Sequence, residues 1–313
     1  LHSGSIMTKA LGSGDQPVLL TENGFSPTWS PDGSSVAFLR QIGDKYELWR
    51  INSSGGSSQL LSKDGVQNFE YTISPYNKVH ASQFVWGPEG ESLLYPATRN
   101  GISNLWQVSV ETRADQALTR NQDENQRVSS PFWAPDGKRI AFYSKTVKRD
   151  SSDEHTYRIW IQNTEPAKAI KLVETKDLIR LLGFSEDKGA LIYARFQKSA
   201  KFSHTPPETE IYSVRLEDGR ENKINSLHFA YFYNIALSPD RKSIAFAARP
   251  KDNDELWITP VTGGTPRRLM VNNDPRFFLS SLDWSPDSGS IFYGKQTRFS
   301  LLSMVVKQHV NGE

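Results

Sequence analysis

Residues 29–33 read Trp-Ser-Pro-Asp-Gly (WSPDG), and this pentapeptide decides the fold because copies of it recur along the whole chain. Three strong copies follow as WGPEG, WAPDG and WSPDS, and two weaker copies read FSEDK and LSPDR. The six copies begin at Trp29, Trp86, Trp133, Phe184, Leu237 and Trp284. Copies that return about every 50 residues indicate one supersecondary unit used six times.

Each copy is followed by the pattern of short antiparallel strands. The SPDG segment predicts a chain reversal, because proline fixes φ, aspartate accepts backbone N–H bonds and glycine tolerates positive φ. In the first repeat, residues 35–39 are then apolar, residues 46–51 alternate between apolar and polar, and residues 54–56 (SGG) turn the chain again. Four such strands per repeat are typical of a propeller blade, which buries its faces against neighbouring blades.

The sequence therefore predicts an all-β fold with a single domain over residues 1–313, a six-bladed β-propeller of four-stranded antiparallel blades. The last repeat lacks a fourth strand, and residues 16–21 match the fourth-strand pattern of residues 59–62. We expect residues 16–21 to complete the last blade and close the ring, which would leave no open sheet edge. Residues 5–9 and residues 301–306 compete for the third strand of that blade.

Composition argues against several classes of function. The chain has 37 Lys and Arg against 35 Asp and Glu, so no global positive field attracts nucleic acid to this domain. No apolar stretch reaches the roughly 20 residues that span a bilayer, and we expect no membrane insertion of this domain. Cysteine is absent, which removes disulfides, thiolate nucleophiles and cysteine-based zinc sites.

The repeats resemble the TolB-like, WD-repeat-like propellers, whose pattern is W-S-P-D-G, an apolar strand, then L-W, and finally G-G-x-x-x-x-L-T. The resemblance covers nearly the whole chain. It implies a bacterial propeller, a periplasmic or other extracytoplasmic location with a cytoplasmic alternative, and a signalling role. Such units also occur in periplasmic translocation proteins, in propellers fused to peptidases, in sensors and in some lyases, so the fold does not decide the function.

Catalytic and cofactor motifs are missing from the sequence. It contains no G-x-S-x-G elbow, no H-E-x-x-H pair and no G-x-x-x-x-G-K loop. We therefore predict no catalytic residue, no metal and no cofactor. Two enzymatic alternatives stay open. One is the propeller domain of a prolyl-oligopeptidase-like enzyme whose hydrolase domain lies outside this chain. The other is a lyase or lactonase with its site in the channel, for which the sequence offers only His80 and His228 as candidate metal ligands.

Residues shared by the repeats are expected to build the blades. The motif tryptophans and the third-strand tryptophans recur at fixed positions, which favours packing over ligand stacking for Trp29, Trp86, Trp133, Trp284, Trp49, Trp106, Trp160 and Trp257. Two enlarged loops, residues 145–155 and 197–208, offer a rim or lid on the face opposite the SPDG turns.

Binding residues are expected on that opposite face. A basic residue lies at or just beyond the end of every second strand, at Arg40, Arg99, Lys145, Arg195, Arg249 and Lys295. Six such positions predict a basic ring that favours an acidic partner. Residues near the starts of first strands would add contact area, with Tyr231, Tyr233, His80, Arg127, Arg180 and Arg276 as the candidates.

Together these patterns predict a non-enzymatic module that binds a ligand or protein, as the sensing or scaffold part of a larger bacterial protein. The expected partner is a protein loop, an extended peptide or a small ligand at the mouth opposite the SPDG turns. Aromatic contacts would supply affinity, and the basic ring would orient the partner.

Overall fold

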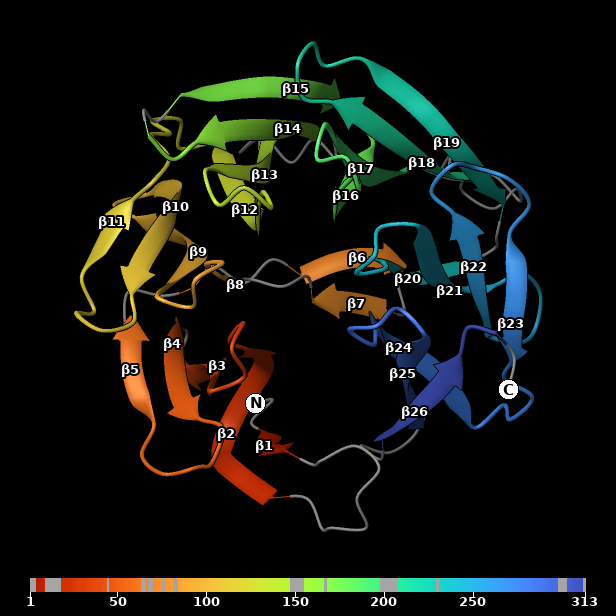
Figure 1. Ribbon diagram of the computed structural model, residues 1–313, viewed down its shortest axis with the longest axis horizontal. Helices are drawn as coiled ribbons and strands as arrows, with labels where there is room; N and C mark the ends of the chain where they lie inside the picture. Colours follow the sequence, from red (N-terminus) through yellow and green to blue (C-terminus); the bar gives the residue numbers. More distant parts are fainter. Residues whose placement is uncertain are drawn as a thin grey trace. The chain divides into compact units, whose positions relative to one another are not determined.

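The computed structural model describes residues 4–8, 18–43, 45–62, 66, 70–74, 77–80, 84–146, 155–165, 168–197, 208–228, 231–297 and 303–311. This part of the chain consists of strands, turns and irregular segments (Figure 1). It contains no helix that could cross a membrane. Its strands form six antiparallel sheets and one extra hairpin, so the predicted six-bladed β-propeller is confirmed.

The chain divides into two units, and the first holds residues 1–69 and 80–171. Its first sheet has the order β1 (Gly4–Thr8), β2 (Val18–Trp29), β3 (Ser35–Ile42), β4 (Lys45–Asn52) and β5 (Gln59–Ser62). The second sheet comprises β8 (Val85–Trp86), β9 (Ser92–Arg99), β10 (Ile102–Ser109) and β11 (Asp115–Ala117). The third comprises β12 (Gln126–Trp133), β13 (Arg139–Thr146), β14 (Thr156–Asn163) and β15 (Ala169–Thr175), of which the residues from Leu172 on belong to the second unit.

The second unit holds residues 70–79 and 172–313. Its first sheet comprises β16 (Leu178–Phe184), β17 (Ala190–Phe196), β18 (Glu208–Arg215) and β19 (Glu221–His228). Its second sheet comprises β20 (Tyr231–Leu237), β21 (Ser243–Arg249), β22 (Glu255–Pro260) and β23 (Arg267–Val271). The last sheet has three strands, β24 (Phe277–Trp284), β25 (Ser290–Thr297) and β26 (Ser303–His309). A separate hairpin pairs β6 (Glu70–Ser74) with β7 (Asn77–His80).

The SPDG turn is held by hydrogen bonds among its own residues. Gly33 has a φ of 70°, and its N–H donates to the Ser30 carbonyl at 2.9 Å. The Ser30 hydroxyl donates to Asp32 Oδ1 at 2.6 Å, and the Ser34 N–H donates to the same oxygen at 3.0 Å. These bonds lower the pKa of Asp32 to about 2, the Ser30 hydroxyl contributing most. The turn therefore keeps an ionised carboxylate at its centre.

The two weaker sequence copies make the same turn without glycine. Lys188 and Arg241 stand where the first copy has Gly33, and their φ values are 61° and 63°. In both copies a serine accepts the hydrogen bond that closes the turn, Ser185 from Lys188 and Ser238 from Arg241. The local bonding is strong enough to hold non-glycine residues in the left-handed region.

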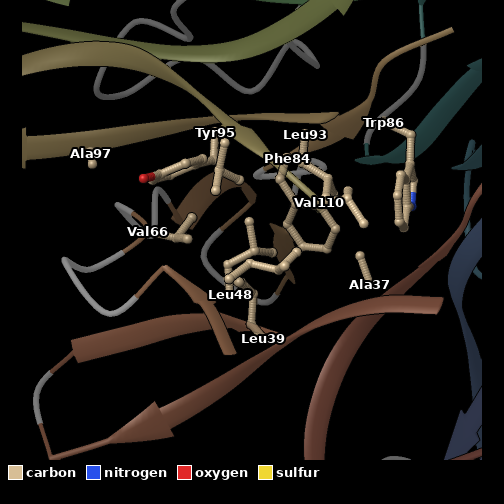
Figure 2. Close-up of a cluster of buried hydrophobic side chains, with 12 residues drawn as sticks. Ala37, Leu39, Leu48, Val66, Phe84, Trp86, Leu93, Tyr95, Ala97 and Val110 are labelled. Atoms are coloured by element: carbon tan, nitrogen blue, oxygen red, sulfur yellow. The ribbon is translucent and has the colours of Figure 1, made fainter. Parts of the chain in front are cut away.

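Neighbouring blades are joined by apolar packing and by a tryptophan hydrogen bond. Between the first two sheets, Leu39 and Leu48 pack with Phe84 and Leu93 in a cluster of buried side chains (Figure 2). Trp86 is 8% exposed, and its indole N–H donates to the carbonyl of Thr28 in the preceding blade at 3.1 Å. The predicted packing role of Trp86 is therefore confirmed.

The other tryptophans divide between packed and exposed positions. Trp284 repeats the Trp86 bond, donating to the Ala236 carbonyl at 3.1 Å while 7% exposed, whereas Trp133 is half-buried. Trp29 is 52% exposed, so the prediction of packing is wrong for this copy. The physical reason is that the first sheet has no preceding sheet within its own unit. The third-strand tryptophans are half-buried; Trp160 and Trp257 stack on aromatic neighbours of their own sheets.

The N-terminal segment pairs differently from the prediction. Thr8, Met7 and Ile6 of β1 pair with Val18, Leu19 and Thr21 of β2. In the described residues, therefore, residues 18–21 belong to the first sheet. That residues 16–21 complete the last blade and close the ring stays a prediction. A local hairpin orders less chain than a pairing between distant segments.

The competition for the third strand of the last blade is also decided. β26 pairs with β25 over Ser303 to His309, whereas the segment around Ile6 belongs to β1. Gly24 makes the hairpin of β1 and β2 possible, since a Cβ there would lie 2.6 Å from Ile6 Cδ1 and 2.9 Å from Phe38 Cδ2.

A matched pair of variants tests the packing between blades. Trp86→Ala should lower the free energy of unfolding by about 3–5 kcal/mol, because it empties a buried site and removes a hydrogen bond. Trp29→Ala makes the same chemical change at the exposed copy and should cost less than about 1 kcal/mol. Urea unfolding followed by tryptophan fluorescence measures both. Equal losses would contradict the role assigned to the indole of Trp86.

Candidate functional site

The predicted basic residues do lie at the ends of second strands, but their side chains are engaged within their own blades. Arg40 donates to the hydroxyls of Thr21 (2.7 Å) and Ser58 (3.0 Å), and its guanidinium carbon lies 4.3 Å from the centre of the Trp49 ring. Burial lowers the pKa of Arg40, although the charge of Glu47 opposes this shift.

Two of these arginines form the same three-residue cluster in different blades. In the second blade, Arg99 forms an ion pair with Asp115 and donates to the Tyr95 hydroxyl at 3.0 Å. In the fourth blade, Arg195 pairs with Glu221 at 2.6 Å and donates to the Tyr193 hydroxyl at 2.8 Å. Each guanidinium also covers a third-strand ring, Trp106 or Tyr212. The clusters join second, third and fourth strands.

The pKa values of the tyrosine and carboxyl groups in these clusters are shifted in opposite directions. Burial raises the pKa of Tyr95 and of Tyr193 well above the ordinary phenol value, so both hydroxyls stay protonated and can donate. Burial would also raise the pKa of Asp115, but hydrogen bonds from Arg99 and Tyr95 outweigh it and hold this pKa below the ordinary value. The acid is therefore ionised at neutral pH.

In the fifth blade, Arg249 is paired with a carboxylate that is wholly buried. Its Nε and one terminal nitrogen both lie 2.7 Å from Asp254 Oδ1, and the Asp254 side chain is 0% exposed. The other carboxylate oxygen of Asp254 accepts the backbone N–H of Leu279 in the next blade at 3.0 Å. This pair therefore connects two blades instead of facing a partner.

The remaining ring positions are lysines beside aromatic rings. Lys145 Nζ lies 5.8 Å from the centre of the Tyr157 ring, and Lys295 Nζ lies 5.6 Å from that of Phe277. Three of the six cations are thus compensated by carboxylates within their blades, which weakens the electrostatic basis for a basic ring. An acidic partner at this ring stays a prediction.

The predicted binding residues near the starts of first strands make different contacts in each blade. Arg127 donates to the carbonyl of Glu124 at 2.5 Å, and Arg180 donates to Asn234 Oδ1 at 3.0 Å. Arg276 is 78% exposed and makes a two-bonded pair with Asp274 at 2.9 and 2.7 Å. The side chains of His80, Tyr231 and Tyr233 lie outside the described residues, as do residues 147–154 and 198–207 of the enlarged loops.

A groove of about 440 Å³ lies where the second blade leads into the third. One side is the segment between β11 and β12, residues 118–125, which we call the inter-blade linker. The other side is aromatic: the rings of Phe142 and Trp160 stack with centroids 6.4 Å apart and an interplanar angle of 13°. We call this site the linker groove; it is lined by Leu118, Thr119, Arg120, Asn121, Gln122, Asp123, Gln126, Val128, Phe142, Trp160, Gln162 and Ala169.

Hydrogen bonds fix the inter-blade linker in place. Asn104 Oδ1 accepts the Thr119 hydroxyl and the Asn121 N–H, both at 2.8 Å. The Asn121 amide nitrogen donates to the carbonyl of Ser103 at 3.0 Å, and Asn121 Oδ1 accepts the Asp123 N–H at 3.0 Å. A linker tied at this many points needs little ordering when a ligand binds.

The floor of the linker groove is fixed in the same way. Gln162 is buried, and its amide nitrogen donates to the Leu118 carbonyl at 2.7 Å. The Ser144 hydroxyl accepts the Trp160 indole N–H at 2.9 Å and the Gln126 amide at 2.6 Å. The exposed residues of the lining are Arg120, Gln122, Asp123 and Ala169.

Sequence reasoning missed most of this groove, although it chose Arg127 beside it. Phe142 and Trp160 look like core residues within their own strands, and only the arrangement of the sheets brings them to the linker. One signal was available: Asn121 and Asp123 are matched by Asn272 and Asp274 before the last blade. In both places the asparagine amide donates to backbone carbonyls of the following turn.

The linker groove offers contacts for binding more readily than groups for catalysis. Its lining contains one carboxylate, Asp123, whose Oδ1 accepts the Asn125 N–H at 2.8 Å. Within the described residues, no group of three or more His, Cys, Asp or Glu side chains could hold a metal ion. His228 lies 3.6 Å from Glu208 at the end of a strand pair and is 71% exposed.

Known proteins resemble this chain in its repeats and in its fold. No family model matches it. The dipeptidyl-peptidase 5 of Porphyromonas gingivalis is 24% identical over 298 residues, which cover 90% of this chain and 39% of that protein. The Tol-Pal system protein TolB of Anaeromyxobacter dehalogenans is 27% identical over 118 residues, which cover 36% of this chain and 24% of that protein. The chain is TolB-like in its repeats.

Among solved structures, the β-propeller domain of the Trilobed protease from Pyrococcus furiosus is similar to this TolB-like chain. The TM-score is 0.63 at 15% identity, covering 99% of this chain and 88% of that chain. That domain has been described as having an open velcro topology. At this identity the likeness concerns the fold alone. The TolB-like chain aligns with less than half the length of either curated relative.

The buried ion pair of the fifth blade gives a second test of stability. Asp254→Ala should lower the free energy of unfolding by about 3–5 kcal/mol, because it leaves the Arg249 charge and the Leu279 N–H without their buried partner. Asp274→Ala removes an exposed pair with the same chemistry and should change stability little. Urea unfolding midpoints measure both. A similar effect at the two sites would show that burial does not set the contribution of Asp254.

Proposed function

We propose that this TolB-like propeller is a non-enzymatic recognition module that binds an extended peptide segment in the linker groove. The observation that carries the proposal is the groove itself, an aromatic floor beside a linker already fixed by hydrogen bonds. Ligand sites in proteins are typically concave and apolar, with a few polar groups that set orientation. The linker groove has this composition.

An extended peptide suits the groove for two reasons. The half-buried Trp160 ring, which stacks on the buried Phe142 ring, provides an apolar surface for side chains, while the exposed Gln122 and Arg120 can exchange hydrogen bonds with peptide amides. A rigid groove also loses little conformational entropy when the peptide is ordered, which favours affinity from a small contact area.

The setting of the module belongs to the same proposal. The similarity to the Tol-Pal system protein TolB supports a protein partner and an extracytoplasmic, periplasmic location in a bacterium. The aligned part covers only a fraction of each relative, which supports the proposal that this module is the sensing or scaffold part of a larger protein.

A second candidate function is favoured by a sequence similarity that extends over most of this chain. The similarity to dipeptidyl-peptidase 5 extends over 90% of this chain. On this account the module is the propeller of a peptidase, and a hydrolase domain elsewhere in the parent protein supplies the nucleophile. The coding sequence on either side of this chain decides the matter: a G-x-S-x-G elbow between a strand and a helix would establish the peptidase, and its absence would remove this candidate.

Peptide selection tests the linker groove directly. We expect a phage-displayed library of random peptides, panned on the chain, to enrich binders whose affinity falls roughly tenfold in the double variant Arg120→Ala/Gln122→Ala. Lys45→Ala, an exposed residue at the start of β4, is the control and should bind as the original chain does. Fluorescence anisotropy of a labelled selected peptide measures all three. No enrichment, or equal binding by all three, would refute the linker groove as the site.

A further inference from the structure

A second groove, of about 870 Å³, lies between the first and second blades at their SPDG turns. The turn residues Asp32 and Ser34 form one side, and Gly90 and Glu91 of the next turn form the other. We call it the turn-face groove; it is lined by Asp32, Ser34, Arg50, Gln59, Gly90, Glu91, Ser92, Gln107, Ser109, Val110, Glu111, Ala114, Asp115 and Gln116. It shares no lining residue with the linker groove.

The charges on this lining are predominantly negative. Four of its residues are acidic, and Arg50 is the one cation among them. Asp115 is compensated by Arg99, but Glu91 and Glu111 are exposed, and no ion pair is recorded for either in the described part of the chain. Asp32 stays ionised because the Ser30 hydroxyl and the Ser34 N–H bind its carboxylate. With Asp115 paired to Arg99 and Arg50 counted against the other three acids, the lining keeps a net charge of two negative.

An equivalent groove between the fourth and fifth blades provides an internal comparison. It measures about 540 Å³ and is built from matching positions, with Asp187 and Asn222 in place of Asp32 and Gln59. There, however, Arg241 stands where the turn-face groove has Gly90, and Lys223 adds a second cation. Two acids face two bases in that groove, so a negative lining is not a general result of blade packing.

In the described part of the chain, two strand edges without a paired neighbour border the turn-face groove. Gln59 lies on β5 and Gln116 on β11, each the outermost strand of its sheet. Edge strands have backbone groups that no neighbouring strand satisfies, and extended peptides commonly bind to such edges. Side-chain amides from Gln59, Gln107 and Gln116 add donors and acceptors at the same place.

We propose that the turn-face groove binds an extended lysine- or arginine-rich segment of a protein partner. Basic side chains of that segment face Glu91, Glu111 and Asp32, while its backbone lies along the open edges beside Gln59 and Gln116. Charge complementarity of this kind sets specificity and speeds association. The propeller then holds two separate peptide sites, one on each end of its strands, and this site does not depend on the linker groove.

The test uses a short labelled peptide in which lysine alternates with serine, with fluorescence anisotropy at low salt as the readout. Glu91→Gln/Glu111→Gln removes two exposed charges and should weaken binding roughly tenfold. Glu165→Gln/Glu217→Gln makes the same charge change at exposed positions outside the groove and should weaken it less than about twofold. The difference between the variants should shrink in high salt, because salt screens exposed charges.

A gain-of-charge variant supplies the complementary test. Gly90→Arg copies the residue of the equivalent groove; Arg241 holds a φ of 63° there, close to the 75° of Gly90. A Cβ at Gly90 would make only ordinary contact with Pro31, at 3.6 Å. We expect this variant to lose binding of the lysine peptide while its urea unfolding midpoint falls only slightly, because a side chain at a positive φ strains the backbone. Failure of the original chain to bind the peptide, or equal weakening by the groove and control variants, would overturn the proposal.

Discussion

The structure depends on the packing of one four-stranded sheet against the next. No blade can bury both of its faces by itself, so each must present a surface that its neighbour completes. The tryptophan of the SPDG motif does this most visibly, since its ring enters the contact and its N–H reaches a carbonyl of the preceding blade. Where no preceding sheet is available in the same unit, the same residue is left in solvent, as Trp29 shows.

Charged residues serve the same packing in a second way. Arginines at the ends of second strands cover third-strand rings and pair with acids on fourth strands, so a charge joins three strands of one sheet. Asp254 extends this to the next blade through the N–H of Leu279. A repeated cation in a propeller sequence can therefore be part of the framework, and repetition alone does not mark it as part of a binding surface.

The sequence was sufficient to predict the blades because their signals are local. Proline, aspartate and glycine specify the turn within five residues, and alternation specifies the strands that follow. The sequence could not predict which side chains would become partners. Arg99 on β9 pairs with Asp115 on β11 only because of the registers of β9 with β10 and of β10 with β11, and Phe142 contacts the linker only after two sheets stack. The pairing of β1 with β2 was not predicted either. The sequence pattern favoured a long-range pairing for this segment, whereas the structure forms a local hairpin.

The turn that repeats in every blade has one further consequence. Glycine, lysine, arginine and serine all occupy its left-handed position, at Gly33, Lys188, Arg241 and Ser288. The backbone hydrogen bonds of the turn are made whichever of these residues is present. The turn therefore forms with different side chains at this position, although a side chain other than glycine strains the backbone there, and one face of the molecule can diversify. Its surface chemistry can change blade by blade, during evolution or by engineering, while the framework beneath stays constant.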